Sequence, residues 1–330
     1  MTEERALRID RRSESTIAEI QNWSAPMPAR GEVRLRARWS SLNYKDALAV
    51  TGKGRILRRF PLNAGVDVSG VIEQSEDPRF QVGDDVLVTG RGLSETRDGG
   101  LATTVTVPAD SVVHLPSGLS LRQAMEYGTA GFAAGLAISR LLDNGQAPEL
   151  GAVAVTGATG GVGSFAIAIL SRLGYTVHAI SRKFDAEDYL KALGATEVIA
   201  LDALRVGTRP LETERYGGVV DNVGGDLLSR LIRVTAAEGN VASIGMAGGV
   251  ELNTTVLPFI LRGVTLIGVR SAGCPMPRRR DVWTHLAGDW KPVTMDSIPM
   301  REITLDEVPG ACDEILAGGH IGRFVVRLAD

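Results

Sequence analysis

Apolar and polar residues alternate along the first third of the chain, which is the pattern of β-strands with one buried face. In the clearest strand, apolar residues take every second position and polar residues lie between them: Val33, Leu35, Ala37 and Trp39 against Arg34, Arg36, Arg38 and Ser40. We therefore expect the arginines of this strand to face water. Further apolar runs at 66–73, 85–89 and 101–107 are separated by turn-forming stretches, which predicts a small β-rich, barrel-like unit.

From about residue 124 the pattern changes to strands that alternate with helices. We expect strands at 152–156, 176–181, 197–201, 218–222, 240–245 and 264–269, and helices at 161–173, 185–193 and 226–235. Such alternation predicts an α/β fold in which helices cover both faces of a parallel six-stranded sheet. After residue 299 only a strand, a helix over 306–317 and a strand over 323–328 are expected. These last elements are too short to form a domain alone.

A glycine-rich turn joins the first of these strands to its helix. The strand at 152–156 leads into Gly157-Ala158-Thr159-Gly160-Gly161-Val162-Gly163-Ser164. Between a strand and a helix, such glycines allow a tight turn, close approach of backbone N–H groups to a pyrophosphate, and close packing of the helix on its strand. We predict a dinucleotide site here. The same glycines divide the long uncharged run between Glu149 and Arg172 into two elements, so we do not expect it to cross a membrane.

The end of the second strand of this unit indicates which dinucleotide binds. It reads Ser181-Arg182-Lys183, with no carboxylate before Asp185. An NAD-specific site usually has an acidic residue there for the ribose 2′-hydroxyl, whereas a cation accommodates the 2′-phosphate of NADPH. The residues favour NADPH. The alternative is that Arg182 and Lys183 are only solvated, although cations at a helix start oppose its dipole.

Composition and charge exclude several classes of protein. The 330 residues include 36 Lys and Arg against 39 Asp and Glu, a net charge of −3, so neither nucleic acid nor an anionic membrane is expected as a partner. Cys274 and Cys312 are the two cysteines, too few for a disulfide framework. The first ten residues have no apolar stretch after their charges, unlike a secretory signal. We expect a cytoplasmic protein.

The order of the elements and several longer motifs carry a family resemblance. The motifs lie in the glycine-rich turn and at 40–48, 51–54, 75–80, 127–132, 189–195 and 258–262. The chain resembles the medium-chain dehydrogenase/reductase superfamily, and within it the NADPH-dependent acrylyl-CoA reductases that have also been described as quinone oxidoreductases. The resemblance implies a GroES-like catalytic domain over 1–123 and 299–330, and a Rossmann NADPH-binding domain over 124–298.

The resemblance also implies a set of cofactor contacts. They are Tyr44, Thr159, Gly160, Gly161, Val162, Ser181, Arg182, Lys183, Met246, Ile260, Ser271 and Arg323. Two positions depart from the family pattern. Lys183 stands where relatives have an arginine, so a bidentate grip on phosphate becomes a point charge, and Leu201 stands where a relative has an arginine near the adenosine.

The zinc ligands of related alcohol dehydrogenases are missing. Those enzymes have a cysteine near the position of Asn43 and a His-Glu pair near Val66-Asp67, and the four histidines here show no ligand spacing. We therefore expect catalysis without metal. Tyr44 is the candidate proton donor or oxyanion stabiliser, with a structural or stacking role as its alternative. Asn43 and Asp46 either orient Tyr44 or the cofactor, or only fix their loop by side-chain hydrogen bonds.

Without a Lewis acid, hydride addition to an activated C=C bond is easier than carbonyl reduction to an alkoxide. The expected reaction is reduction of acrylyl-CoA to propionyl-CoA. Alternatives are reduction of a quinone or another small enoyl-CoA or enone, and nucleotide binding without turnover. A cationic cluster, either Lys53, Arg55, Arg58 and Arg59 or Arg278, Arg279 and Arg280, is a candidate for the CoA phosphates. The resemblance further implies a homodimer, for which the apolar strand at 264–269 is a candidate edge.

Overall fold

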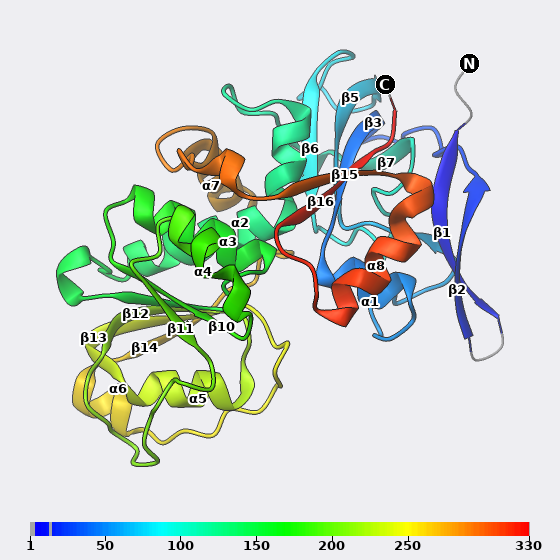
Figure 1. The fold of residues 1–330 in the computed structure, drawn as a ribbon. Coiled ribbons are helices and arrows are strands. Elements are labelled where there is room, and N and C mark those ends of the chain that lie inside the picture. The colour runs from blue at the N-terminus through cyan, green and yellow to red at the C-terminus, as the bar shows by residue number, and fades with distance from the viewer. Residues whose placement is uncertain (1–3, 13–14, 330) are drawn as a thin grey trace. The chain divides into compact units, whose positions relative to one another are not determined.

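The computed structural model describes residues 4–12 and 15–329, which form two compact units. One unit is Met1–Thr129 with Ala272–Trp283 and Met300–Asp330, and the other is Ala130–Ser271 with Thr284–Pro299. We refer to them as the β-rich unit and the sheet–helix unit (Figure 1). No described helix has the length and apolar character that crossing a membrane requires.

The β-rich unit contains two sheets. In the smaller sheet, β1 (Arg5–Arg12) lies between β2 (Ser15–Asn22) and β4 (Leu62–Asn63). The larger has the order β15-β16-β3-β5-β6-β8, and β7 also pairs with β3. Its strands are β3 (Glu32–Leu42), β5 (Asp67–Ser75), β6 (Asp85–Thr89), β7 (Thr104–Pro108), β8 (Val113–His114), β15 (Met300–Thr304) and β16 (Arg323–Arg327). The C-terminal strands therefore complete the sheet that the N-terminal third begins.

The helices of the β-rich unit include α1 (Tyr44–Val50) and α8 (Val308–Ala317). Both bury small apolar residues in one core cluster, among them Ala47 and Val50 from α1 with Ala311 and Cys312 from α8. Figure 1 shows these two helices side by side, although they are far apart in the chain. Their packing fixes the start of α1, where the predicted catalytic residues lie.

The alternation in β3 is only partly the predicted one. Val33, Leu35 and Ala37 are buried as expected, but Arg34 is also buried, with 8% of its surface exposed. The prediction that it faces water is wrong because its guanidinium lies 3.0 Å from Glu4 and 3.5 Å from Glu73. These carboxylates compensate its desolvation.

The sheet–helix unit is built on a parallel six-stranded sheet. Its order is β11-β10-β9-β12-β13-β14, formed by β9 (Val153–Thr156), β10 (Val177–Ser181), β11 (Glu197–Ala200), β12 (Tyr216–Asp221), β13 (Thr235–Ser243) and β14 (Thr265–Gly268). The first strand lies in the middle and the chain winds outward in both directions. This is the Rossmann order, so the predicted fold class is confirmed.

Helices cover both faces of this sheet (Figure 1). α3 (Gly161–Arg172) and α4 (Glu187–Ala192) lie on one face, and α5 (Gly225–Arg233) lies on the other. The long uncharged run forms β9 and α3, as predicted. The remaining elements are α2 (Leu121–Asp143), α6 (Leu257–Arg262), α7 (Met276–Ala287), and short 3₁₀ turns at Ala109–Ser111, Pro148–Leu150, Phe184–Ala186, Met295–Ser297 and Leu305–Glu307.

Candidate active site and dinucleotide turn

The side chain of Asn43 joins two buried carboxylates in the β-rich unit. Its amide nitrogen donates to Asp67 over 2.8 Å and to Asp46 over 3.1 Å, while its amide oxygen accepts a hydrogen bond of 3.2 Å from Arg323. Asn43 precedes α1 and Asp67 opens β5. All the hydrogen-bonding groups of this amide are engaged, so its orientation is fixed by the fold.

Asp67 accepts hydrogen bonds from four donors. Besides Asn43, these are the Ser41 hydroxyl at 2.7 Å, the Thr129 backbone N–H at 2.7 Å and the Thr129 hydroxyl. Thr129 is reachable because α2 is kinked at Gly128, which has φ +50° and ψ −153°. A Cβ there would lie 2.3 Å from the Ser41 hydroxyl and 2.7 Å from Asp67. Glycine is therefore required by both the kink and the crowding.

Asp46 fixes the first turn of α1. Its carboxylate accepts the Asn43 backbone N–H at 2.8 Å, one half of a capping box, and the Val66 backbone N–H at 2.9 Å. The pKa of Asp46 is raised to about 7, mainly by burial and also by the charge of Asp67. The hydrogen bonds from Asn43 and Val66 act in the opposite direction. Asp46 and Asn43 thus do fix the loop, one of the two roles predicted for them.

Arg323 is buried in the same network. Its guanidinium donates to the carbonyl oxygens of Leu42 (2.8 Å) and Glu126 (3.3 Å) and to the Ser41 hydroxyl (3.0 Å), in addition to Asn43. Burial lowers the pKa of Arg323, while the charges of Asp67 and Asp46 oppose this change. Most of its N–H groups are already engaged, so the structure places Arg323 as a support of Asn43 and Asp67.

Tyr44 is the exposed member of this region. It is the first residue of α1, with 51% of its surface exposed, and within the described chain its hydroxyl makes no hydrogen bond. The next residue, Lys45, forms an ion pair with Glu95. The network below Tyr44 therefore holds its backbone, while its hydroxyl is available to a ligand.

The turn after β9 has the groups that a pyrophosphate requires. Gly160 is the N-cap of the twelve-residue helix α3, and the backbone N–H groups of Gly161, Val162 and Gly163 have no acceptor in the part of the chain that the structure describes. A Cβ on Gly163 would lie 2.4 Å from the Gly157 carbonyl oxygen, so glycine allows the helix to pack on the turn. Thr159 is buried beside these donors. A helix start with free donors attracts anions.

The end of β10 carries Ser181, Arg182 and Lys183, the three residues predicted to contact a 2′-phosphate. Ser181 is buried, and its hydroxyl accepts the Lys183 backbone N–H over 3.0 Å. Arg182 is exposed and Lys183 is partly exposed. Burial is the main cause that lowers the pKa of Lys183, and Arg182 lowers it further while Asp185 raises it.

The other expected cofactor contacts are spread over the sheet–helix unit. Met246 follows β13 and is 69% exposed, and Ile260 lies in α6 and is 67% exposed. Ser271 is the last residue before the chain enters the β-rich unit, and it is partly exposed. Exposed apolar side chains of this kind are free to contact a ligand or a partner.

Comparison with known proteins places this geometry in a family. Residues 29–117 match the model described as "Alcohol dehydrogenase GroES-like domain", and residues 161–287 match the model described as "Zinc-binding dehydrogenase". The chain is 42% identical to "Acrylyl-CoA reductase AcuI" of Ruegeria pomeroyi over 97% of this chain and 98% of that protein. It belongs to the medium-chain dehydrogenase/reductase superfamily.

Other members of this superfamily are similar over the same length. "Putative quinone oxidoreductase YhfP" of Bacillus subtilis is 43% identical over 98% of both chains. The crystal structure of the yhdH oxidoreductase from Salmonella enterica in complex with NADP has a TM-score of 0.94 at 43% identity, covering 98% of this chain and all of that one. That of Bacillus subtilis yhfP with NAD bound has a TM-score of 0.95 at 43% identity, covering 99% of this chain and all of that one.

One of the two family descriptions names zinc, and the residues here do not fit that metal. Zinc binds deprotonated thiolates, neutral imidazoles and carboxylates. Asn43 supplies an amide whose N–H groups face the carboxylates, and Asp67 already accepts four hydrogen bonds. Among the described residues no group of three or more His, Cys, Asp and Glu side chains could hold a metal ion.

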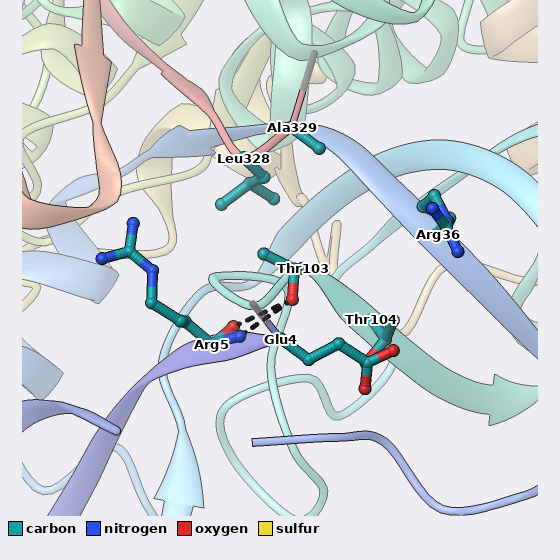
Figure 2. Close-up of a pocket in the computed structure, with 7 residues that line it drawn as sticks. All are labelled: Glu4, Arg5, Arg36, Thr103, Thr104, Leu328 and Ala329. Atoms are coloured by element: carbon teal, nitrogen blue, oxygen red, sulfur yellow. Dashed lines mark hydrogen bonds between the residues drawn. The ribbon is translucent and has the colours of Figure 1, made fainter. Parts of the chain in front are cut away.

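A pocket of about 300 Å³ in the β-rich unit contains none of the predicted site residues. Figure 2 shows the seven residues that line it: Glu4, Arg5, Arg36, Thr103, Thr104, Leu328 and Ala329. Its charged groups are engaged, because Arg36 donates to Glu73 over 2.7 Å and Glu4 accepts from Arg34 over 3.0 Å. We assign no chemistry to this pocket.

Sequence reasoning missed how Asp67, Ser41 and Thr129 act together. A signal was present, because Asp67 interrupts an otherwise apolar strand and Gly128 interrupts a helical pattern. A buried carboxylate in such a strand requires donors from elsewhere in the fold.

Proposed function

We propose that this chain is an NADPH-dependent reductase that converts acrylyl-CoA to propionyl-CoA. The observation that carries the proposal is its 42% identity with the acrylyl-CoA reductase AcuI over 97% of this chain. The substrate is accordingly a small CoA thioester. The Asn43 network and the dinucleotide turn are the two parts of the chain that the reaction would use.

The dinucleotide turn fits NADPH. The free N–H groups of Gly161, Val162 and Gly163 would bind the pyrophosphate, with Thr159 and Gly160 beside them. Ser181, Arg182 and Lys183 would hold the 2′-phosphate, and no carboxylate lies among them to repel it. Met246, Ile260 and Ser271 would contact the remainder of the cofactor. One relative was crystallised with NADP and another with NAD, and the two cations after β10 favour NADPH in this chain.

The chain's own residues would control protonation and position. With NADPH bound, a hydride would be available for the β-carbon of the C=C bond, and a proton would be needed at the α-carbon. Tyr44 would donate a hydrogen bond to the thioester oxygen or the proton to the α-carbon, because the residue is half exposed and its hydroxyl has no acceptor in the described structure. Asn43 and Asp46 would act as positioning residues, since they fix the first turn of α1.

Turnover of acrylyl-CoA tests this proposal directly. We expect NADPH oxidation that depends on acrylyl-CoA and forms propionyl-CoA, with slower reduction of crotonyl-CoA. A β-methyl group hinders close approach of the β-carbon to the hydride donor in a tight site. Binding of NADPH without oxidation, in the presence of acrylyl-CoA, crotonyl-CoA and quinones, would instead indicate a nucleotide-binding protein.

Quinone reduction is the second candidate function. It is favoured by the 43% identity with the protein named quinone oxidoreductase YhfP. A quinone also accepts a hydride and delocalises the resulting charge without a metal. Rapid NADPH oxidation with a quinone and none with acrylyl-CoA would establish this alternative.

We also propose the domain limits, setting and assembly of the protein. The GroES-like domain would comprise 1–123 and 299–330, and the Rossmann domain 124–298, in a cytoplasmic homodimer. The edge position of β14 and the exposed Val256 and Leu261 support a partner on the sheet–helix unit. Light scattering at micromolar concentration should give twice the chain mass, and the mass of one chain would contradict the dimer.

A further inference from the structure

The loop between α1 and β4 carries four exposed cations. They are Lys53, Arg55, Arg58 and Arg59. In the chain as described, none of their side chains forms a hydrogen bond or an ion pair. Four cations within seven residues repel one another, and a surface ion pair would be the usual compensation. The described residues therefore leave the positive charge of this loop without an ion pair.

A second loop adds further positive charge at the same place. The Arg58 backbone N–H donates to the Glu95 carbonyl oxygen over 2.8 Å, which joins the two loops. Burial is the main cause that lowers the pKa of Arg97; the charges of Arg91 and Arg59 lower it further and Glu32 opposes them. The Nη1 atom of Arg97 is buried and makes no hydrogen bond to any described residue. Arg59, Arg91 and Arg97 are thus close enough for their charges to interact.

Three carboxylates beside these loops are ion-paired, and a fourth, Glu32, accepts the Ala29 backbone N–H over 3.0 Å and acts on Arg97 through its charge. Glu95 is paired with Lys45, and Asp98 lies 3.4 Å from Arg8 and accepts the Asn63 backbone N–H. Asp110 is paired with Arg79 at 2.8 Å. The positive potential of the two loops is therefore left for an anion from outside the chain.

An exposed aromatic ring borders the cations. Phe60 follows Arg59 and is 36% exposed, and the Arg11 guanidinium lies 6.0 Å from its ring centroid. Exposed aromatic rings next to arginines are suited to stack a nucleotide base while the cations contact its phosphates.

The other predicted cationic run, Arg278 to Arg280, is unsuitable as a whole. Arg279 is 1% exposed and donates to the carbonyl and hydroxyl oxygens of Thr89.

We propose that these residues form a binding site for the phosphorylated adenosine end of the CoA thioester. The site, which we call the cationic loop cluster, comprises Lys53, Arg55, Arg58, Arg59, Phe60, Arg91 and Arg97. The inference rests on the proposed function. The loop directly follows α1, and Arg58 also lies near the start of that helix, because Glu95, whose carbonyl oxygen accepts the Arg58 N–H, is paired with Lys45, the residue after Tyr44. The pantetheine arm would extend from the cluster to Tyr44.

The test compares two thioesters in one variant. Arg58→Ala with Arg59→Ala removes two exposed cations that make no side-chain hydrogen bond in the described structure, so folding should be unaffected. We expect the KM for acrylyl-CoA to rise about tenfold or more with kcat within about twofold. The KM for acrylyl-N-acetylcysteamine, which lacks the nucleotide, should not change. Arg30→Ala with Arg172→Ala, two exposed cations elsewhere, is the charge-matched control and should leave both KM values unchanged.

Calorimetry with CoA itself separates failure of the site from failure of the function. Titrations with NADP⁺ saturating should show CoA binding about tenfold weaker in the Arg58, Arg59 variant than in wild type and control. If wild type reduces acrylyl-CoA and the variant keeps its KM, the cluster is not the site although the function stands. If wild type reduces neither thioester, the proposed function fails. If, in addition, CoA binds neither to wild type nor to the Arg58, Arg59 variant, or binds equally to the two, the proposed site fails as well.

Discussion

The side-chain amide of Asn43 donates to the Asp67 carboxylate over 2.8 Å, across 24 positions of the chain. In zinc-dependent relatives, metal ligands are expected near these positions. Here the contact is a hydrogen bond, and Ser41, Thr129 and Arg323 surround it. The space beside the start of α1 is therefore held by a protein network, which sets both the stability of the β-rich unit and the position of Tyr44.

Metal content should reflect this network. We expect no stoichiometric zinc and full activity in the presence of a chelator, because Asn43 and the saturated Asp67 do not provide a zinc site. Elemental analysis of the purified protein and assays with a chelator check this. One equivalent of tightly bound metal per chain would contradict it.

Asp67→Asn should destabilise the β-rich unit. An amide has one acceptor oxygen and would turn its NH₂ group toward the donors of Ser41, Asn43 or Thr129, leaving buried groups unsatisfied. We expect a loss of about 3 kcal/mol in the free energy of unfolding, measured with urea. Asp85→Asn is the control, because Asp85 is exposed and lies on β6, in the same sheet as Asp67. This substitution should change the free energy of unfolding by less than about 0.5 kcal/mol. Equal effects of both substitutions would show that the network contributes nothing.

The raised pKa of Asp46 predicts a pH-dependent difference in stability. Its pKa changes from 3.8 to about 7 on folding, so the folded chain binds more protons than the unfolded chain between these values. The stabilisation from the protonated carboxyl is complete below about pH 4 and is lost as the pH rises through about 7. Relative to Asp46→Asn, wild type should lose unfolding free energy between about pH 4 and pH 7. A difference that does not vary with pH would mean that folding leaves the pKa of Asp46 unchanged.

Removing both cations after β10 should affect one cofactor. In Arg182→Ala with Lys183→Ala, we expect kcat/KM for NADPH to fall about ten- to a hundredfold and that for NADH to change little, because charge-assisted contacts to the 2′-phosphate are lost. Lys191→Ala, which removes an exposed cation paired with Glu187, is the control and should alter neither value. Equal losses with NADPH and NADH would refute the assignment.

Tyr44→Phe should affect the chemical step more than binding. The ring is retained and only the hydroxyl is lost, so a donor role predicts a kcat about ten- to a thousandfold lower with a smaller change in KM. Steady-state kinetics with acrylyl-CoA, together with cofactor titrations, separate the two effects. Wild-type turnover in this variant would leave Tyr44 with packing or cofactor contact alone.

The sequence by itself determined the features that depend on neighbouring residues. The glycine-rich turn, the alternation of strands and helices after residue 124, and the Ser181-Arg182-Lys183 end of β10 are set by local periodicity and backbone freedom, and the structure has each of them. Asn43, Tyr44 and Asp46 are within one turn of each other, so their proximity also followed from the sequence.

Only the tertiary structure decided which polar groups are buried together. Arg34 was expected in water and is buried, because Glu4 and Glu73 come to it from other segments. Asp67 meets Ser41, Asn43 and Thr129 through three separate elements, and Gly128 is needed only because they converge. A buried charge is stable only where its partners lie within a few ångströms. That condition is met by pairing across the sheet and by the kink in α2, and neither is encoded in a local pattern.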